Sequence, residues 1–256
     1  MVTDPYFYVV AVFSVFLHGM AKGGFAGSLA LLAIPMMAFF IPPFQAVAIL
    51  LIPLIFMDIV TVYRYRGMWD WSIVRYIIPL GIFGVVIGTI SFKFMSDDHI
   101  RILIGLLALA FSLDYFLRTS DSEPKKASRI GSYFWPTLSG FTSFSIHAGG
   151  LPLSFYLLPK RLDRRVYAAT MGIYFLAMNL FKIFPYAYLE QMTFENIKTS
   201  LMLLPLAPLG VYFGAFMVEK VGQEWFYKIS YFCLSIAGLK LIYDGRSSLF
   251  LSLIHI

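Results

Sequence analysis

Long apolar stretches separated by short polar loops run along the whole chain of 256 residues. Apolar runs of about 20 residues are the length that a bilayer-spanning helix requires. The longest polar segment, residues 118–132, is too short to form a soluble domain, so we interpret it as a connection. The pattern therefore predicts an all-α integral membrane protein that lies in the lipid bilayer.

An internal repeat divides the chain into two related halves. The string P-L-x-x-x-G-x-x-x-G begins at Pro79 and again 126 positions later, at Pro205. The pair Gly23-Gly24 recurs at the same displacement and in the same order, as Gly149-Gly150. One match of this kind is weak, because small residues four apart are common in membrane helices, but two matches that share one displacement indicate a duplication. We expect an N-terminal repeat, a linker and a C-terminal repeat at residues 1–117, 118–130 and 131–256.

Each half is predicted to hold one broken hydrophobic segment followed by three membrane-spanning helices. In the first half the broken segment covers residues 6–40, and the spans cover 44–63, 72–94 and 99–117. In the second half the broken segment covers residues 131–158, and the spans cover 166–186, 197–218 and 225–243. The closing stretch, residues 247–256, is too short to span a bilayer.

The loop charges predict the orientation of these elements. Lys and Arg are in excess at residues 64–75, 118–129 and 160–165, which places all three loops in the cytoplasm. The broken segment of the second half then enters and leaves from the cytoplasm, as a hairpin that turns near Gly149-Gly150. By the same argument the first broken segment is a hairpin from the outside that turns near residues 22–24. The two halves are therefore expected to be inverted, as in secondary transporters that bind substrate between broken helices.

The hairpin turns are the first candidates for an anion site. A helix that begins at Gly24 or Gly150 directs free backbone N–H groups and a partial positive charge toward the middle of the membrane. Glycine also lets an anion approach the backbone closely. The alternative is that the glycines permit close helix packing and the nearby hydroxyls bind backbone carbonyls. The candidate substrate-binding residues at the two turns are Lys22, Gly23, Gly24, Gly27, Ser28, Ser143, Ser145, His147, Gly149 and Gly150.

Polar residues inside the predicted spans are the second group of candidates, because charge within a membrane is costly unless it has a function. Asn179 and Lys182 are three residues apart and so share one face of a helix. Lys182 is expected either to neutralise a bound anion or to extend its amine to the outer interface. Asp58, in the corresponding helix of the first half, is a candidate for coupling by a proton, or for pairing with a base across the bundle.

Other function classes find little support in the sequence. The net charge of +6 is explained by the cytoplasmic loops, so no nucleic-acid partner is expected. The four histidines lack metal-ligand spacing and no P-loop motif occurs, so neither a metal nor another cofactor is expected. No nucleophile–base spacing points to an enzyme. An anion channel, a membrane enzyme and a structural subunit stay as alternatives to a transporter, and a homodimer is possible for either transporter or channel.

Two strings carry a resemblance to a known family. H-G-M-A-K-G-G-F-A-G-S-L begins at His18, and F-T-S-F-S-I-H-A-G-G-L-P begins at Phe141, followed by Thr170, Asn179 and Lys182. Together they resemble the TauE/SafE family of sulfite and organosulfonate exporters, over nearly the whole chain.

The resemblance implies a multi-pass protein of the cell inner membrane that exports small anions such as sulfite, sulfoacetate or related organosulfonates and carboxylates. It places the glycine-rich turns of the family on residues 23, 24 and 27 and on residues 149 and 150. Phe25-Ala26 interrupts the first glycine run, which leaves room for a different or larger anion, such as an aromatic or aliphatic carboxylate.

Overall fold

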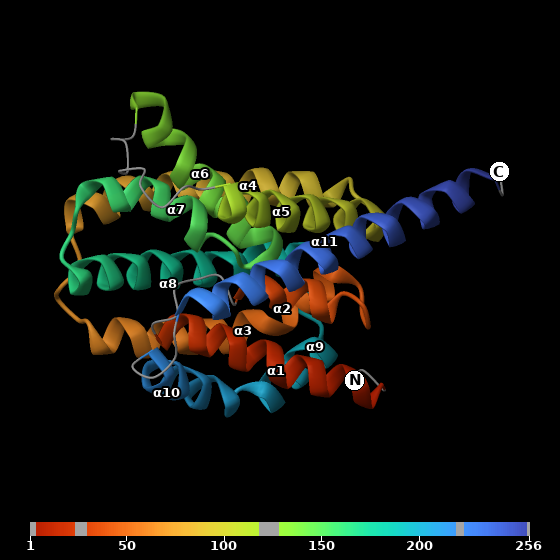
Figure 1. The fold of residues 1–256 in the computed structure, drawn as a ribbon, viewed down its shortest axis with the longest axis horizontal. Helices are drawn as coiled ribbons and strands as arrows, with labels where there is room; N and C mark the ends of the chain where they lie inside the picture. Colours follow the sequence, from red (N-terminus) through yellow and green to blue (C-terminus); the bar gives the residue numbers. More distant parts are fainter. Residues whose placement is uncertain (1–3, 24–29, 118–127, 219–222, 255–256) are drawn as a thin grey trace.

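The protein is a helical bundle in the computed structural model, which describes residues 4–23, 30–117, 128–218 and 223–254 (Figure 1). These residues form eleven α-helices and one 3-10 turn, and none of them is in a β-strand. The helices of the first half are α1 (Pro5–Gly23), α2 (Ala30–Met37), α3 (Pro43–Arg64), α4 (Trp71–Lys93) and α5 (Asp97–Leu117). Those of the second half are α6 (Arg129–Ile146), α7 (Gly150–Leu157), η1 (Leu158–Lys160), α8 (Arg164–Tyr188), α9 (Phe194–Leu203), α10 (Leu206–Val218) and α11 (Gln223–Ile254).

Five of the described helices are long and apolar enough to cross a membrane: α1, α3, α4, α5 and α8. Their outward faces carry large apolar side chains, for example Phe83 (59% exposed), Leu113 (56%) and Phe184 (73%). Exposed apolar surface on this scale is unfavourable in water but stable against lipid tails. The prediction of an all-α membrane protein is confirmed at this level.

Two of the predicted spans differ from the observed helices. The span expected at residues 197–218 is broken, because α9 ends at Leu203 and α10 begins at Leu206. Pro205 explains the break, since proline has no N–H to donate to the carbonyl oxygen one turn earlier. The last span was expected at residues 225–243, but α11 continues to Ile254, so the described part of the closing stretch prolongs this helix.

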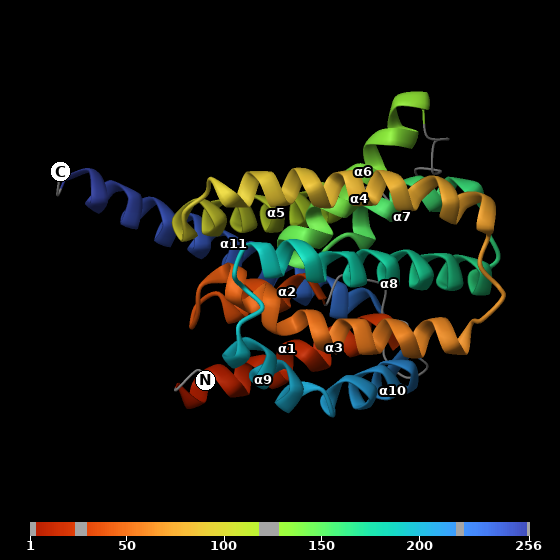
Figure 2. The same cartoon turned by 180° about the vertical axis from the view of Figure 1, so that it is seen from behind.

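The two broken segments form helical hairpins that enter the bundle from opposite ends. In Figures 1 and 2 the α1–α2 hairpin enters from the end that holds the N-terminus. The α6–α7 hairpin enters from the other end, where the connections α3–α4 and η1–α8 also lie. Both views place α8 between a layer that contains α4 and α5 and a layer that contains α1, α3 and α10. The C-terminal end of α1 and the turn between α6 and α7 lie close together in the interior, since the ring centroids of His18 and His147 are 6.2 Å apart.

Three glycines of the repeated P-L-x-x-x-G-x-x-x-G motif, Gly84, Gly88 and Gly210, are packing positions. A Cβ at Gly84 of α4 would lie 2.0 Å from the Thr137 carbonyl oxygen of α6, and one at Gly88 would lie 2.6 Å from the ring of Phe144. Gly210 of α10 is less tight but still close to its neighbour, since a Cβ there would lie 2.9 Å from the Phe16 carbonyl oxygen of α1. Close approach of backbones is the main use of small residues in membrane helices. Each motif helix thus packs against one arm of a hairpin.

Gly84→Ala is expected to destabilise the fold, because the added methyl group forces α4 away from α6. Overpacking of this kind costs about 1–3 kcal/mol. Thermal unfolding in detergent measures the loss, with Ile90→Ala on the 57% exposed, lipid-facing side of the same helix as the matched control. Equal melting temperatures for the two variants would contradict the assigned packing role.

Candidate functional site

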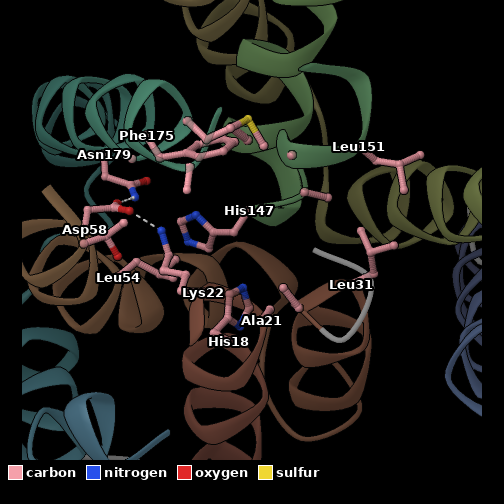
Figure 3. A pocket seen from close by; sticks show the side chains of 18 of the residues that line it. His18, Ala21, Lys22, Leu31, Leu54, Asp58, His147, Leu151, Phe175 and Asn179 are labelled. Carbon is pink, nitrogen blue, oxygen red and sulfur yellow. Dashed lines mark hydrogen bonds and ion pairs between the residues drawn. The ribbon is translucent and has the colours of Figure 1, made fainter. Parts of the chain in front are cut away.

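A cavity of about 300 Å³ lies where the hairpin tips meet α3 and α8 (Figure 3). Six helices contribute to its wall, namely α1, α2, α3, α6, α7 and α8. Its polar lining residues include His18, Lys22, Asp58, His147 and Asn179, and most of the remaining wall is apolar. The cavity therefore joins a small polar cluster to an apolar chamber inside the bundle.

Asp58 is the centre of the polar cluster. Its carboxylate is buried and accepts a hydrogen bond and ion pair from Lys22 Nζ on one oxygen, and a hydrogen bond from Asn179 Nδ2 on the other. A carboxylate at this depth needs such partners, because removal from water is costly for an unpaired charge. The cluster therefore ties together the last turn of α1, the middle of α3 and the middle of α8, as the dashed lines in Figure 3 show.

Lys182 organises the tip of the second hairpin. Its Nζ atom donates to the Ser143 carbonyl oxygen (2.9 Å), the Ser143 hydroxyl (3.2 Å) and His147 Nδ1 (2.8 Å). These three acceptors use all three hydrogens of the ammonium group. His147 Nε2 in turn donates to the Val47 carbonyl oxygen at 2.8 Å, so the ring is a neutral imidazole with its proton on Nε2. His147 also ends α6 in a left-handed conformation, with φ of 54°. Lys182 thus holds a turn that the backbone alone would not favour.

Two lysine amines lie at or near the cavity wall. Lys22 lines the cavity and is paired with Asp58, so this pair carries no net charge. Lys182 lies behind Ser143 and His147 and donates hydrogen bonds to both. Lysine N–H groups donate hydrogen bonds that the oxygen atoms of an anion can accept. The site therefore offers donors suited to a small anion.

The tip of α7 adds backbone donors to this environment. The helix begins at Gly150, as predicted, and no side chain caps it. Pro152 has no N–H, so the donors that a helix start leaves free are here those of residues 149, 150 and 151. Gly150 lines the cavity, and a Cβ there would have nothing nearer than 3.9 Å. This glycine leaves the helix start open to the chamber.

Not all predicted site residues come together. Lys22, Asp58, Ser143, His147, Gly150 and Asn179 line the cavity. Lys182 is fully buried rather than extended to an interface, so that interpretation was wrong. The base predicted to pair with Asp58 across the bundle is Lys22, itself a candidate from the first turn.

Two candidates are held away from the cavity by packing. The Ser145 hydroxyl donates to the Phe141 carbonyl oxygen at 2.9 Å within α6, and Ser145 is not among the residues that line the cavity. Gly149 packs against Ser139, whose carbonyl oxygen would lie 2.6 Å from an added Cβ. For these two residues the packing alternative raised from the sequence is the one that the structure shows.

The first glycine turn is only partly visible. Gly23 ends α1, and the next described residue is Ala30, which begins α2. Gly24, Gly27 and Ser28 lie outside the described residues, as does the helix start expected at Gly24.

Sequence reasoning missed the apolar wall of the cavity. Leu31, Leu54, Leu151, Met171 and Phe175 all line it. Their only signal in the sequence is hydrophobicity, which does not separate a cavity wall from packed core or from a lipid-facing surface.

Two buried polar atoms at the cavity wall have no hydrogen-bond partner among the described residues. They are Nε2 of His18 and Oδ1 of Asn179. His18 Nδ1 lies 3.3 Å from the Ser14 carbonyl oxygen and so carries the proton of a neutral ring, which leaves Nε2 as an acceptor. Asn179 Nδ2 is fixed by Asp58, so its Oδ1 is also an acceptor. An unsatisfied buried group costs about 1–3 kcal/mol, so a donor from outside the described residues would be stabilising.

Lys22→Met is expected to destabilise the protein more than the double variant Lys22→Met/Asp58→Asn. The single change leaves a buried carboxylate without its cation, which costs about 3 kcal/mol or more, whereas the double change removes both charges. Melting temperatures in detergent measure the difference. If both variants have the same melting temperature, the ion pair does not stabilise the contact between α1 and α3.

Alanine substitutions at the adjacent Gly149 and Gly150 distinguish a packing role from a role in ligand binding. Gly149→Ala is expected to lower the yield of folded protein, because its methyl group meets the Ser139 backbone. Gly150→Ala is expected to fold normally but to reduce ligand binding and transport, because its methyl group enters the cavity. Size-exclusion profiles and anion flux measure the two effects. Loss of folding in Gly150→Ala with normal folding in Gly149→Ala would reverse the assignment.

The comparison with known proteins gives one match. The family described as Sulfite exporter TauE/SafE matches residues 11–241, which include every helix from α1 to α10 in whole or in part. No curated protein and no solved structure matches the chain. Since the match covers most of the 256 residues, the chain belongs to the TauE/SafE sulfite exporter family, whose members are membrane transporters of sulfite or related anions.

Proposed function

We propose that this protein is a secondary transporter that exports small anions by alternating access. The proposed substrates are sulfite, sulfoacetate or related organosulfonates and carboxylates. The observation that carries the proposal is the cavity between the hairpin tips, which Lys22 lines and beside which Lys182 is buried. A broken helix pair from each end, with a charged site between the tips, is the arrangement that transporters place near the middle of the bilayer.

Helix packing supports the proposed inverted repeat. The motif helix of the first half, α4, packs against α6 of the second-half hairpin, and the motif helix of the second half, α10, packs against α1 of the first-half hairpin. The remaining counterparts pack on each other, α3 on α8 and α5 on α11. An exchange of equivalent contacts is what a pseudo-two-fold axis in the membrane plane would produce.

The cavity extends toward the end that carries the basic loops. Its lining includes Tyr65, just after α3, and Tyr167, in the first turn of α8. Both residues adjoin the Lys- and Arg-rich segments 64–75 and 160–165, which the proposal places in the cytoplasm of a cell whose inner membrane holds the protein. In this proposal the described conformation faces inward.

Four aromatic side chains close the opposite end. Phe44, Phe92, Phe144 and Tyr186 form a cluster with ring centroids 5.1–5.6 Å apart, and the ring centroid of Tyr186 lies 6.5 Å from that of His147 at the cavity. Beyond the cluster lies a second cavity of about 520 Å³, which Phe44 and Phe92 also line. We assign this aromatic cluster as the closed outer gate, and the second cavity as the outer vestibule.

A closed gate favours a carrier over the alternative of an anion channel, which needs a continuous pore. A membrane potential that is negative inside already drives anion exit by about 2.3 kcal/mol per charge per 100 mV, so no coupled ion is required. Asp58 would bind and release a proton in the cycle only if its bonds to Lys22 and Asn179 changed. We therefore assign Asp58 the role of positioning Lys22 and Asn179, and proton coupling is the alternative role.

The test is anion flux in proteoliposomes loaded with sulfite, sulfoacetate or a carboxylate. Saturable, trans-stimulated efflux is expected for the native protein, and absence of protein-dependent flux for every anion would refute the proposal. For the gate, Phe44→Cys/Tyr186→Cys in a Cys233→Ser background is expected to lose transport when the two thiols are bridged by a bifunctional methanethiosulfonate reagent and to recover it on reduction. Each single cysteine variant is the control for loss of the aromatic ring. Flux that continues in the cross-linked protein would exclude this gate.

A further inference from the structure

The apolar wall of the cavity restricts the class of substrate further than the charged residues do. The volume of about 300 Å³ lies at the lower end of the range for sites that bury organic ligands, roughly 300–1,000 Å³, and far exceeds the roughly 30 Å³ that one water molecule occupies. An inorganic oxyanion bound at Lys22 would fill only a small part of this space. Most of the chamber would then stay in contact with leucine, methionine and phenylalanine side chains, where an oxyanion gains nothing.

The polar groups gather on one side of the chamber, where Leu54 also lies, and the opposite side is apolar. Figure 3 shows Lys22, Asp58 and Asn179 on one side and Leu31 and Leu151 on the other. A ligand that uses both sides must itself have a charged end and an apolar end.

Phe175 connects the two sides. It comes from α8, lines the cavity, and its ring centroid lies 5.5 Å from Lys22 Nζ. A ligand whose anionic group reaches Lys22 would therefore place its body against the ring of Phe175. Flat rings gain more from such a contact than small aliphatic groups do, because they bury more area and can stack or pack edge to face.

The unpaired acceptors add a further requirement. His18 Nε2 and Asn179 Oδ1 both belong to side chains at the polar end of the cavity. A carboxylate, sulfonate or sulfite oxygen cannot satisfy either atom, since all of them are acceptors too. A hydroxyl or amino group beside the anionic group of the ligand would supply the missing donor.

We propose that the cavity binds an organic anion that has a ring-sized apolar body and an O–H or N–H donor next to its charged group, in preference to a bare inorganic oxyanion. The inference rests on the proposed function and narrows its substrate class. Lys22 binds the anionic group, Phe175 and the leucine side of the chamber contact the body, and Asn179 or His18 accepts the donor.

Four probe anions test the two requirements separately in the full-length protein. Mandelate has a ring and a hydroxyl next to its carboxylate. Phenylacetate has the ring but no hydroxyl, and lactate has the hydroxyl but no ring. Sulfite is an inorganic anion without an organic body. Binding is measured by calorimetry in detergent. Mandelate is expected to bind on the order of tenfold more tightly than phenylacetate or lactate, and more tightly still than sulfite.

Substitutions in α8 test whether the apolar wall contacts the ligand. Phe175→Ala is expected to lower the affinity for mandelate far more than the affinity for lactate, so that the two affinities converge. Phe184→Ala, on the 73% exposed face of the same helix, is the matched control and should bind all four probes as the native protein does. If Phe175→Ala is poorly folded, Phe175→Leu keeps an apolar side chain and should still lose preference for the ring.

The outcomes separate this inference from the function on which it rests. Sulfite or lactate bound as tightly as mandelate would overturn the inference and leave anion transport standing. Phenylacetate bound as tightly as mandelate would overturn the requirement for a donor. Absence of both binding and flux for every anion would overturn the proposed function itself.

Discussion

The site depends on how the protein accommodates one carboxylate inside a membrane. Asp58 is buried at the middle of α3, where an isolated negative charge would be strongly unfavourable. Its two oxygens are satisfied by Lys22 from α1 and Asn179 from α8. Because these partners come from different helices, neutralising the charge also fixes the positions of three helices. The cavity lies beside this junction. The position of its polar end is therefore determined by the residues that neutralise Asp58.

Close helix packing brings the hairpin tips to that junction. Gly84 and Gly88 let α4 approach α6, and Gly19 and Gly210 let α1 approach α10, so each hairpin is supported by a helix from the other half. The tip of the second hairpin can then carry Ser143 and His147, which accept hydrogen bonds from Lys182 of α8. Glycine therefore serves two purposes in this chain. At most positions it permits packing, and at Gly150 it leaves open space beside a helix start.

The sequence predicts the helical class, the hairpins and most of the polar end of the site, because each leaves a specific pattern. Glycine pairs, a repeated motif and intramembrane charge are rare enough to be informative, and they identified Lys22, Asp58, His147 and Asn179. The partners of these residues were not predicted, since Lys22 and Asp58 are 36 positions apart and their contact depends on the crossing of α1 and α3. The break at Pro205 was missed because the apolar run around it is continuous and outweighed the proline in the prediction.

The arrangement of charges also bears on how an anion could leave the site. A carrier must bind its substrate well enough to select it and weakly enough to release it. Two lysines alone in a low-dielectric chamber would hold an anion strongly. Asp58 competes for Lys22, and Ser143 and His147 occupy the hydrogens of Lys182, so neither amine is fully available to a ligand. The remaining attraction is long-range and modest, and selectivity must then come from contacts that do not depend on net charge. The wall formed by Phe175 and its apolar neighbours is the part of the cavity able to supply them.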